Sequence, residues 1–243
     1  MPAIPLTMKT LAVDSSLAVG SVAALSGDRL AERALPLPGE HAKRLAGALV
    51  EVASLLGWSP GDVELLAVVR GPGSFTSLRV GVATVKAMAW ATGAKLLGVS
   101  GFEVIAWRAA RAGGGSTDVS TAQPIEIAYD AGRGDVYAAT ARPEPSSPSG
   151  WSVGPAAILP AGDWFAALPQ AAVVSGPGLE LLAGRHDERP DLRIAQRECW
   201  TPTAAAAGAI ALLRFAAGEA DDIAGLVPDY LRPSYAQEKD ARP

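Results

Sequence analysis

The stretch RGPGSFTSLRVG, residues 70–81, joins an apolar run to a long helical segment, and the rest of the chain can be placed around it. Before it, residues 63–69 (VELLAVV) have the composition of a strand that is buried on both faces of a parallel sheet. After it, residues 76–92 contain no proline and carry apolar residues at helical spacing. The stretch therefore predicts a strand, a glycine-rich turn and a helix in succession.

The predicted turn brings small residues and hydroxyl groups to the start of that helix. Gly71 and Gly73 allow the backbone to bend sharply and to approach a neighbour closely, while Ser74 can cap exposed N–H groups. A turn of this kind before a helix forms an anion site in some proteins and a plain connection in others. The sequence matches neither a Walker A loop nor a nucleophile elbow, so it predicts a site-like turn and assigns it no chemistry.

A second group of polar residues lies at the tip of an N-terminal hairpin. Residues 10–13 and 19–25 predict the two strands of this hairpin, and residues 29–35 predict a third strand. At the tip, Asp14 and Ser15 offer a carboxylate and a hydroxyl that either hold a nucleotide phosphate or its metal, or form only an Asx-type turn. The residues of this vestigial nucleotide or phosphate site are Asp14, Ser15, Gly71, Gly73 and Ser74.

The composition excludes several classes of protein. With 243 residues, 49% of them hydrophobic, the chain is long enough to bury a large core. A net charge of -4 argues against a protein that binds nucleic acid by itself. Cys199 is the only cysteine, which excludes an internal disulfide and a cysteine zinc site. Because the first residues lack a signal-peptide pattern and no apolar run reaches membrane-spanning length, we expect a cytoplasmic protein with no membrane contact.

The sequence also predicts two domains. Residues 108–123 (RAARAGGGSTDVSTAQ) have the composition of a loop or hinge between them. Residues 124–141 then repeat the layout of the first hairpin, with a strand, an aspartate-containing tip and a second strand, and residues 171–174 begin another strand, turn and helix. We expect two similar α/β domains, residues 1–106 and 107–243, with the last segment of the second packing back on the first.

Five motifs together resemble the TsaB family, formerly called YeaZ. They are Asp14-Ser15-Ser16, Glu40-His41, RGPGSFTSLRVG at 70–81, YDAGRGDVY at 129–137 and PDYLRP at 228–233. The resemblance covers nearly the whole chain, and it departs from the usual pattern at Ser77, where most relatives have glycine. It implies the actin, hexokinase and Hsp70-like (ASKHA) fold, which agrees with the two α/β domains expected above.

What the resemblance implies about function is a noncatalytic role. TsaB is the noncatalytic subunit of the bacterial complex that makes N6-threonylcarbamoyladenosine in tRNA, next to the anticodon. The implied partners are the transferase subunit TsaD and the ATPase subunit TsaE, with a homodimer when the chain is alone. The resemblance implies that this chain contacts tRNA only indirectly, as part of the complex. The resemblance implies no cofactor of the chain's own, and confines ATP or ADP to an interface shared with partners.

The metal site of TsaD is missing from this sequence. In TsaD a His-x-x-x-His pair binds the metal, and the matching positions here are Gly101 and Ile105. Two imidazoles one helical turn apart can share a metal ion, whereas neither of these side chains can coordinate one. The resemblance thus implies a degenerate paralogue of the transferase with no metal and no catalytic residue.

Two enzymatic alternatives of the same fold stay open at this point. The first is an ATP-dependent phosphotransferase of the sugar-kinase type that uses Asp14 and the turns near Gly73 and Gly132. The sequence argues against this phosphotransferase alternative, because residues 176–178 predict only a minimal turn where, by analogy, an adenosine-binding segment is expected. The second is a peptidase, for which the sequence marks no Ser-His-Asp set, although such sets are spatial.

Two predicted helices suggest the surface that meets the partner. Residues 40–56 and 76–92 both show more apolar surface than one sheet contact requires. We therefore expect them to pair with the equivalent helices of TsaD, or of a second copy, as a four-helix interface; the alternative is that the chain's own other domain covers them. The expected interface residues are Leu45, Leu49, Val52, Leu78, Val82, Val85 and Ala89.

Overall fold

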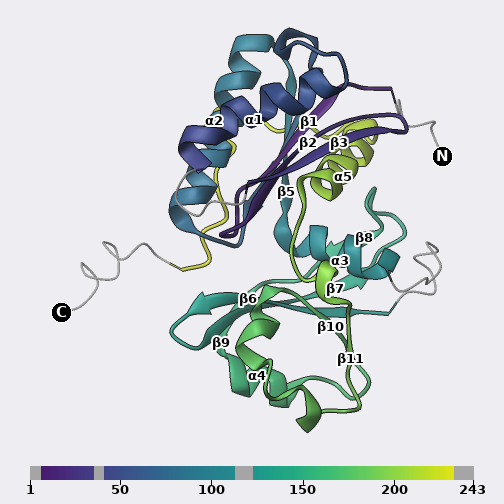
Figure 1. The fold of residues 1–243 in the computed structure, drawn as a ribbon. Coiled ribbons are helices and arrows are strands. Elements are labelled where there is room, and N and C mark those ends of the chain that lie inside the picture. The colour runs from purple at the N-terminus through teal and green to yellow at the C-terminus, as the bar shows by residue number, and fades with distance from the viewer. Residues whose placement is uncertain (1–6, 36–40, 113–122, 233–243) are drawn as a thin grey trace.

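The computed structural model describes residues 7–35, 41–112 and 123–232, and these form two α/β domains that lie one above the other (Figure 1). Each domain is built on its own sheet. The expected α/β class with two domains is confirmed. In the described part of the chain, no helix combines the length and the apolar character that crossing a membrane requires.

The first sheet has five strands in the order β3-β2-β1-β4-β5. β1, β2 and β3 are antiparallel, as expected for the N-terminal hairpin and its third strand, while β4 and β5 run parallel to β1. The bounds are Thr10–Asp14 for β1, Gly20–Ser26 for β2, Arg29–Leu35 for β3, Leu65–Gly71 for β4 and Lys95–Ser100 for β5.

Helices cover both faces of this sheet. α1 (His41–Leu55) and α2 (Phe75–Thr92) lie on one face, where their apolar side chains share a core with those of β1, β2 and β4. α3 (Gly101–Ala112) and α5 (Ala204–Ala216) lie on the other, where Val104 and Ile210 join a second core. With both faces covered, the central strands β1 and β4 are almost wholly buried, which explains their continuous apolar sequence.

The second sheet has the strand order β11-β10-β6-β7-β8, with β9 paired to β7. α4 (Ala161–Ala167) covers one face of it, and α3 lies against the other, so α3 is shared between the two domains. The strands are β6 (Ile125–Gly132), β7 (Asp135–Pro143), β8 (Trp151–Val153), β9 (Ala157–Pro160), β10 (Val173–Ser175) and β11 (Arg193–Ile194). Short 3-10 helices span Pro60–Asp62, Pro177–Leu182, His186–Glu188 and Arg197–Cys199.

Two sequence predictions about this second half need correction. The predicted loop at residues 108–123 is wrong for residues 108–112, which continue α3, while residues 113–122 lie outside the described residues. The strand, turn and helix predicted from residue 171 end instead in the 3-10 helix Pro177–Leu182. The turn before it packs tightly, because a Cβ on Gly176 would lie 2.2 Å from the Ala128 carbonyl oxygen. The second domain therefore does not repeat the long helix that follows the first turn.

Candidate functional site

The glycine-rich turn packs directly on the tip of the first hairpin. The Ser74 N–H, at the start of α2, donates a hydrogen bond of 2.8 Å to the Ser16 carbonyl oxygen. A Cβ on Gly73 would lie only 2.2 Å from that same oxygen, so the contact requires glycine at this position. The close approach predicted for the turn is therefore real, and the neighbour is the chain's own backbone.

The polar residues of the hairpin tip bond to one another and to α2. Asp14 Oδ1 accepts the Ser16 N–H at 2.9 Å and the Ser16 hydroxyl at 2.7 Å, which is the Asx-type bond considered from the sequence. The Ser15 hydroxyl donates to the Ser77 carbonyl oxygen at 2.8 Å. All three tip residues are at most 1% exposed. The carboxylate and the hydroxyls that could hold a phosphate are thus engaged inside the protein.

The structure therefore brings Asp14, Ser15, Gly73 and Ser74 to one contact that leaves little for an anion to bind, whereas Gly71 lines the neighbouring cavity. The Ser74 N–H, which would face a phosphate at the helix start, already has a backbone partner. The Ser74 side chain makes no cap hydrogen bond to the N–H groups of the first turn of α2. A phosphate could enter only if the hairpin tip moved away from α2. The contact between the hairpin tip and the turn is closed in this structure, and the phosphate site expected at Asp14, Ser15, Gly71, Gly73 and Ser74 stays a prediction.

The Tyr129 side chain fills the space beside Gly101, the position that we expected to match the first metal ligand of TsaD. A Cβ on Gly101 would lie 2.4 Å from the Tyr129 hydroxyl oxygen, so no larger residue fits there while Tyr129 keeps its place. Ile105, the second position, is completely buried. Burial and the nearby Asp14 carboxylate raise the pKa of the Tyr129 hydroxyl well above its ordinary value. Among the described residues, no three metal-binding side chains come together.

A cavity of about 590 Å³ lies between the domains, beside the turn. Gly71 and Phe102 line it from the first domain, Val153 from the second, and Tyr230 from the C-terminal segment. Its charged residues are Arg70 and Asp229, joined by an ion pair of 3.5 Å. Burial raises the pKa of the Asp229 carboxyl even though the Arg70 guanidinium opposes this shift. Sequence reasoning missed this cavity, because its walls come from segments far apart in the chain.

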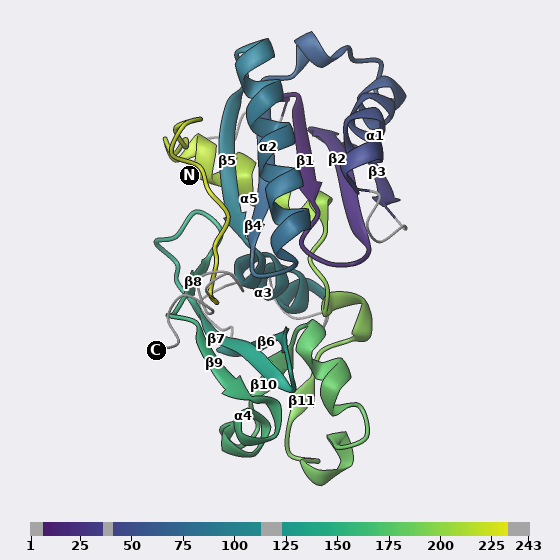
Figure 2. The ribbon, with the colours of Figure 1, turned by 90° about the vertical axis from the view of Figure 1, so that its left-hand side faces the viewer.

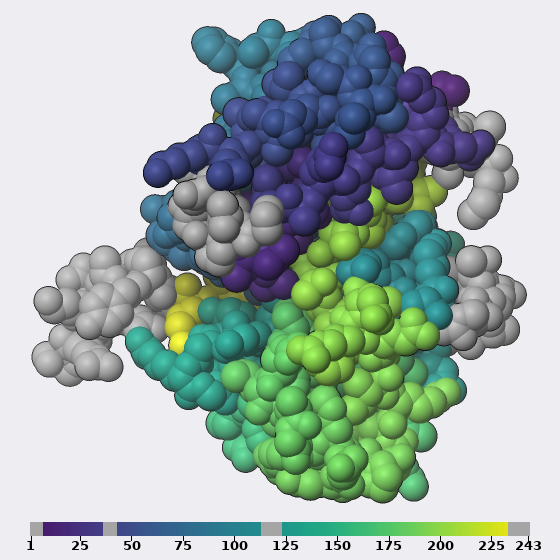
Figure 3. Space-filling view, in the orientation of Figure 1, coloured from purple at the N-terminus to yellow at the C-terminus, as the bar shows by residue number. Residues whose placement is uncertain are grey.

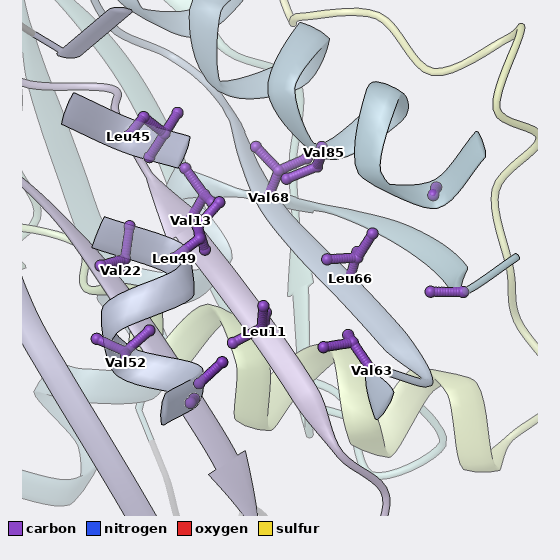
Figure 4. Close-up of a cluster of buried hydrophobic side chains, with 14 of the residues drawn as sticks. Leu11, Val13, Val22, Leu45, Leu49, Val52, Val63, Leu66, Val68 and Val85 are labelled. Carbon is purple, nitrogen blue, oxygen red and sulfur yellow. The ribbon is translucent and has the colours of Figure 1, made fainter. Parts of the chain in front are cut away.

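The seven residues predicted for the partner interface face the protein's own core. Figure 4 shows Leu45, Leu49 and Val85 directed toward the strands of the first sheet. Each of the seven is at most 4% exposed, so a partner could reach them only by opening the core. The choice of Leu45, Leu49, Val52, Leu78, Val82, Val85 and Ala89 is therefore corrected: these side chains hold α1 and α2 on their own sheet.

The opposite sides of the same two helices are exposed and carry apolar residues beside charged ones, among them Lys43, Arg44 and Glu51 on α1. Val50 and Leu55 on α1 are 44% and 56% exposed, and Trp90 on α2 is 84% exposed. Small residues lie between these larger ones, and the exposed ones are Ala46, Gly47, Ala83 and Ala87. Figure 3 shows the outer surface of α1 in the upper part of the view. We name this surface the outer helix face and define it by Ala46, Gly47, Val50, Leu55, Ala83, Ala87 and Trp90.

Two sheets with this connectivity, sharing the helix α3 and meeting at a central cavity, define a two-domain protein of the actin, hexokinase and Hsp70-like fold. Residues 38–145 match the model of the family "TsaD: tRNA N6-adenosine threonylcarbamoyltransferase". The solved structure of YeaZ from Pseudomonas aeruginosa superposes with a TM-score of 0.75 and 26% identity, covering 92% of this chain and 100% of that one.

Two curated relatives carry the name "tRNA threonylcarbamoyladenosine biosynthesis protein TsaB". The Bacillus subtilis protein is 28% identical over 96% of this chain and 97% of its own length. The Escherichia coli protein is 31% identical, and that alignment spans about half of each protein, 54% of this chain and 53% of the relative. Together with the YeaZ structure, these relatives confirm the resemblance of the chain to the TsaB, or YeaZ, family.

Proposed function

We propose that the chain takes part in the biosynthesis of tRNA threonylcarbamoyladenosine as a noncatalytic subunit that binds and organises the transferase TsaD. The pathway is the one named for the TsaB relatives. The observation that carries the structural part of the proposal is the outer helix face, where Val50, Leu55 and Trp90 are 44%, 56% and 84% exposed. Exposed apolar surface of this kind marks interaction sites in proteins that are otherwise well packed.

The proposed contact is a packing of α1 and α2 against the equivalent helices of TsaD, or of a second copy when TsaD is absent. Small residues such as Gly47 and Ala83 let a partner helix approach closely, while Val50 and Trp90 supply the large apolar side chains. Aromatic residues at such positions supply much of the binding energy in protein interfaces. TsaE and tRNA then meet this chain through the assembled complex, and ATP or ADP binds only where partners share an interface.

The noncatalytic part of the proposal rests on the closed turn and on the position of Tyr129. A phosphotransferase of this fold would need Asp14 and the turn at Gly73 to be open to a nucleotide, and here both contact the chain itself. A metal at Gly101 would compete with the Tyr129 hydroxyl for space. We therefore expect no threonylcarbamoyl transfer to tRNA by the isolated chain, and turnover above background would contradict the proposal.

The interface is tested with Val50→Glu and the matched control Leu181→Glu. The two side chains are 44% and 43% exposed, so a charge is tolerated equally well in the free chain, but Leu181 lies in the second domain, away from the outer helix face. A carboxylate buried in an apolar interface costs about 3 kcal/mol, which corresponds to a loss of affinity for TsaD of about a hundredfold. Sedimentation and calorimetric titration with TsaD measure this loss.

The control should bind TsaD as the natural chain does, and both variants should keep the natural circular dichroism spectrum. Trp90→Ala is a second test at the other end of the face, with an expected weakening of at least about tenfold. If Val50→Glu and Trp90→Ala both bind TsaD normally, the partner contacts another surface and the proposed interface is wrong.

A further inference from the structure

The segment after α5 runs back along the edge of the first domain toward the second domain (Figure 2). The Asp221 N–H donates to the Leu96 carbonyl oxygen at 2.8 Å, and the Asp221 carboxylate accepts the Gly98 N–H at 2.7 Å. Leu226 is only 2% exposed and belongs to the core under α2. We name residues 221–232 the C-terminal strap. Its first half is thereby fixed to the edge strand β5 of the first sheet.

α2 holds the middle of the strap. The Lys86 ammonium donates to the carbonyl oxygens of Ala224 and Leu226, both at 3.1 Å. Further along, Arg79 Nε donates to the Tyr230 hydroxyl at 2.9 Å, and the Phe75 and Tyr230 rings lie 4.7 Å apart. Arg79 and Lys86 are the two charged residues of this helix, and each donates hydrogen bonds to the strap.

The end of the strap crosses the gap and binds the second domain. Arg232 donates to the Ala131 carbonyl oxygen at 3.1 Å and to the Asp135 carboxylate at 2.7 Å, both at the tip between β6 and β7. The Arg232 and Asp135 side chains are 21% and 29% exposed, so solvent screens this charge-assisted pair only in part. Just before it, Leu231 packs against the apolar cluster between the domains that contains Phe102 and Tyr129.

We propose that the C-terminal strap is a clamp that fixes the angle between the two domains without any bound ligand. Domains move relative to one another by default unless a large apolar interface holds them, and many two-domain proteins close only around a ligand. In this protein the apolar core around α3 joins the two domains, and the strap adds a second connection between them. Here a segment anchored along the whole edge of the first domain ends in an ion pair on the second. The strap also forms one wall of the cavity between the domains, through Asp229 and Tyr230. Domain separation therefore requires the strap to detach at Arg232.

The test measures the distance between the domains by electron spin resonance with paired spin labels. Labels are placed at Arg33→Cys in β3 and Asp187→Cys in the second domain, both exposed and away from the strap, in a Cys199→Ser background. Labelled chain is diluted with unlabelled chain, so that distances within one chain dominate. We expect one narrow distance distribution for the natural strap and a clearly broadened one for Arg232→Ala.

The matched control is Arg197→Ala, which removes an ion pair of 2.6 Å to Glu180 that lies wholly within the second domain. This control should keep the narrow distribution. Asp135→Ala should broaden the distribution less than Arg232→Ala does, because Arg232 keeps its bond to the Ala131 carbonyl oxygen. The double variant should broaden it no further than Arg232→Ala, and Arg232→Lys should restore part of the order. If Arg232 acted only locally, Asp135→Ala would leave the distance distribution narrow.

Hydrogen exchange supplies a second measurement on the same proteins. The Asp229 N–H donates to the Arg70 carbonyl oxygen at 2.9 Å, and opening of the clamp should raise its exchange rate by at least about tenfold. The proposal is overturned if Arg232→Ala and Asp135→Ala both keep the narrow distribution, or if Arg197→Ala broadens it equally. It is also overturned if the Asp229 amide exchanges at the natural rate in both strap variants.

Discussion

The two hairpin tips of the molecule share a local structure but differ in what lies over them. In the first domain Asp14 accepts the Ser16 N–H at 2.9 Å, and in the second Asp130 accepts the Gly132 N–H at 2.6 Å. The first tip is buried under α2, whereas Asp130 is exposed, and its tip is contacted by Arg232 and by the Ala161 N–H, which donates to the Gly134 carbonyl oxygen. The same aspartate turn thus serves as a packed core element in one domain and as an anchor point in the other.

The largest difference between the tips should appear when a methyl group is added beside each. Gly73→Ala places a Cβ 2.2 Å from the Ser16 carbonyl oxygen, and we expect it to lower the free energy of unfolding by about 3 kcal/mol or more. A Cβ on Gly132 would have no neighbour within 4 Å, so Gly132→Ala should lower the free energy of unfolding by only about 1 kcal/mol, the cost of its positive φ of 74°. Urea unfolding of both variants gives the comparison. Equal losses would show that the first tip is not tightly packed on the turn.

Removing each aspartate carboxylate should give a smaller contrast in the same direction. Asp14→Ala leaves the buried Ser16 N–H and hydroxyl without this acceptor, which should cost about 2 kcal/mol of unfolding free energy. Asp130→Ala exposes its former partner to water and should cost about 0.5 kcal/mol. Thermal and urea unfolding measure both. A cost at Asp130 as large as that at Asp14 would remove the distinction between a buried tip and an open one.

The smallest expected effects concern two carboxyl groups whose pKa values shift in opposite directions. Burial raises the pKa of Glu103 above its ordinary 4.5, despite a hydrogen bond from Ser149 and the Arg214 guanidinium. The folded state then binds more protons, so this group lowers stability as the pH rises from about 4.5 through the raised value. In the second domain, Arg189 lowers the pKa of Asp191 from 3.8 to about 2. Asp191 therefore stabilises the fold above pH 3.8, and this contribution is lost as the pH falls toward 2.

Substitution by the neutral amide separates the two cases. Glu103→Gln should become more stable than the natural chain as the pH rises above 4.5, while Arg214 keeps its bond of 2.8 Å to Glu219. Asp191→Asn should be less stable than the natural chain at neutral pH, and this difference should disappear near pH 2. Urea unfolding across this pH range tests both signs. If Glu103→Gln is destabilised at neutral pH, the charged carboxylate is a net stabiliser and the predicted sign is wrong.

The backbone of the first domain was largely predictable from sequence. The expected strand at residues 29–35 is β3 without change, and the helix predicted at 76–92 is α2 (Phe75–Thr92). Helical spacing failed to tell which side of each helix is exposed, because it identifies an apolar stripe and cannot say whether a sheet or a partner covers it. The exposed side carries Gly47 and Ala83, whose small side chains give no strong apolar signal.

The contacts that close the molecule were not predictable from local patterns. Arg232 and Asp135 lie 97 residues apart, and neither belongs to a periodic run. The Tyr129 hydroxyl fills the space beside Gly101 only because α3 lies between the two sheets. Both Tyr129 and Arg232 fall in motifs that carried the family resemblance, so the motifs marked the right residues without saying what they contact.

Because α5 packs on the first sheet, it determines the order in which the two domains can be completed during synthesis on the ribosome. Ala12, Ala67 and Leu97 on one face of that sheet pack against α5, which is among the last elements to be synthesised. Residues 125–200, by contrast, hold all six strands of the second sheet in one continuous run. Domains near the N-terminus usually fold first during synthesis. In this chain the first domain starts first but is completed only after the second, when α5 and then Leu226 emerge and cover it.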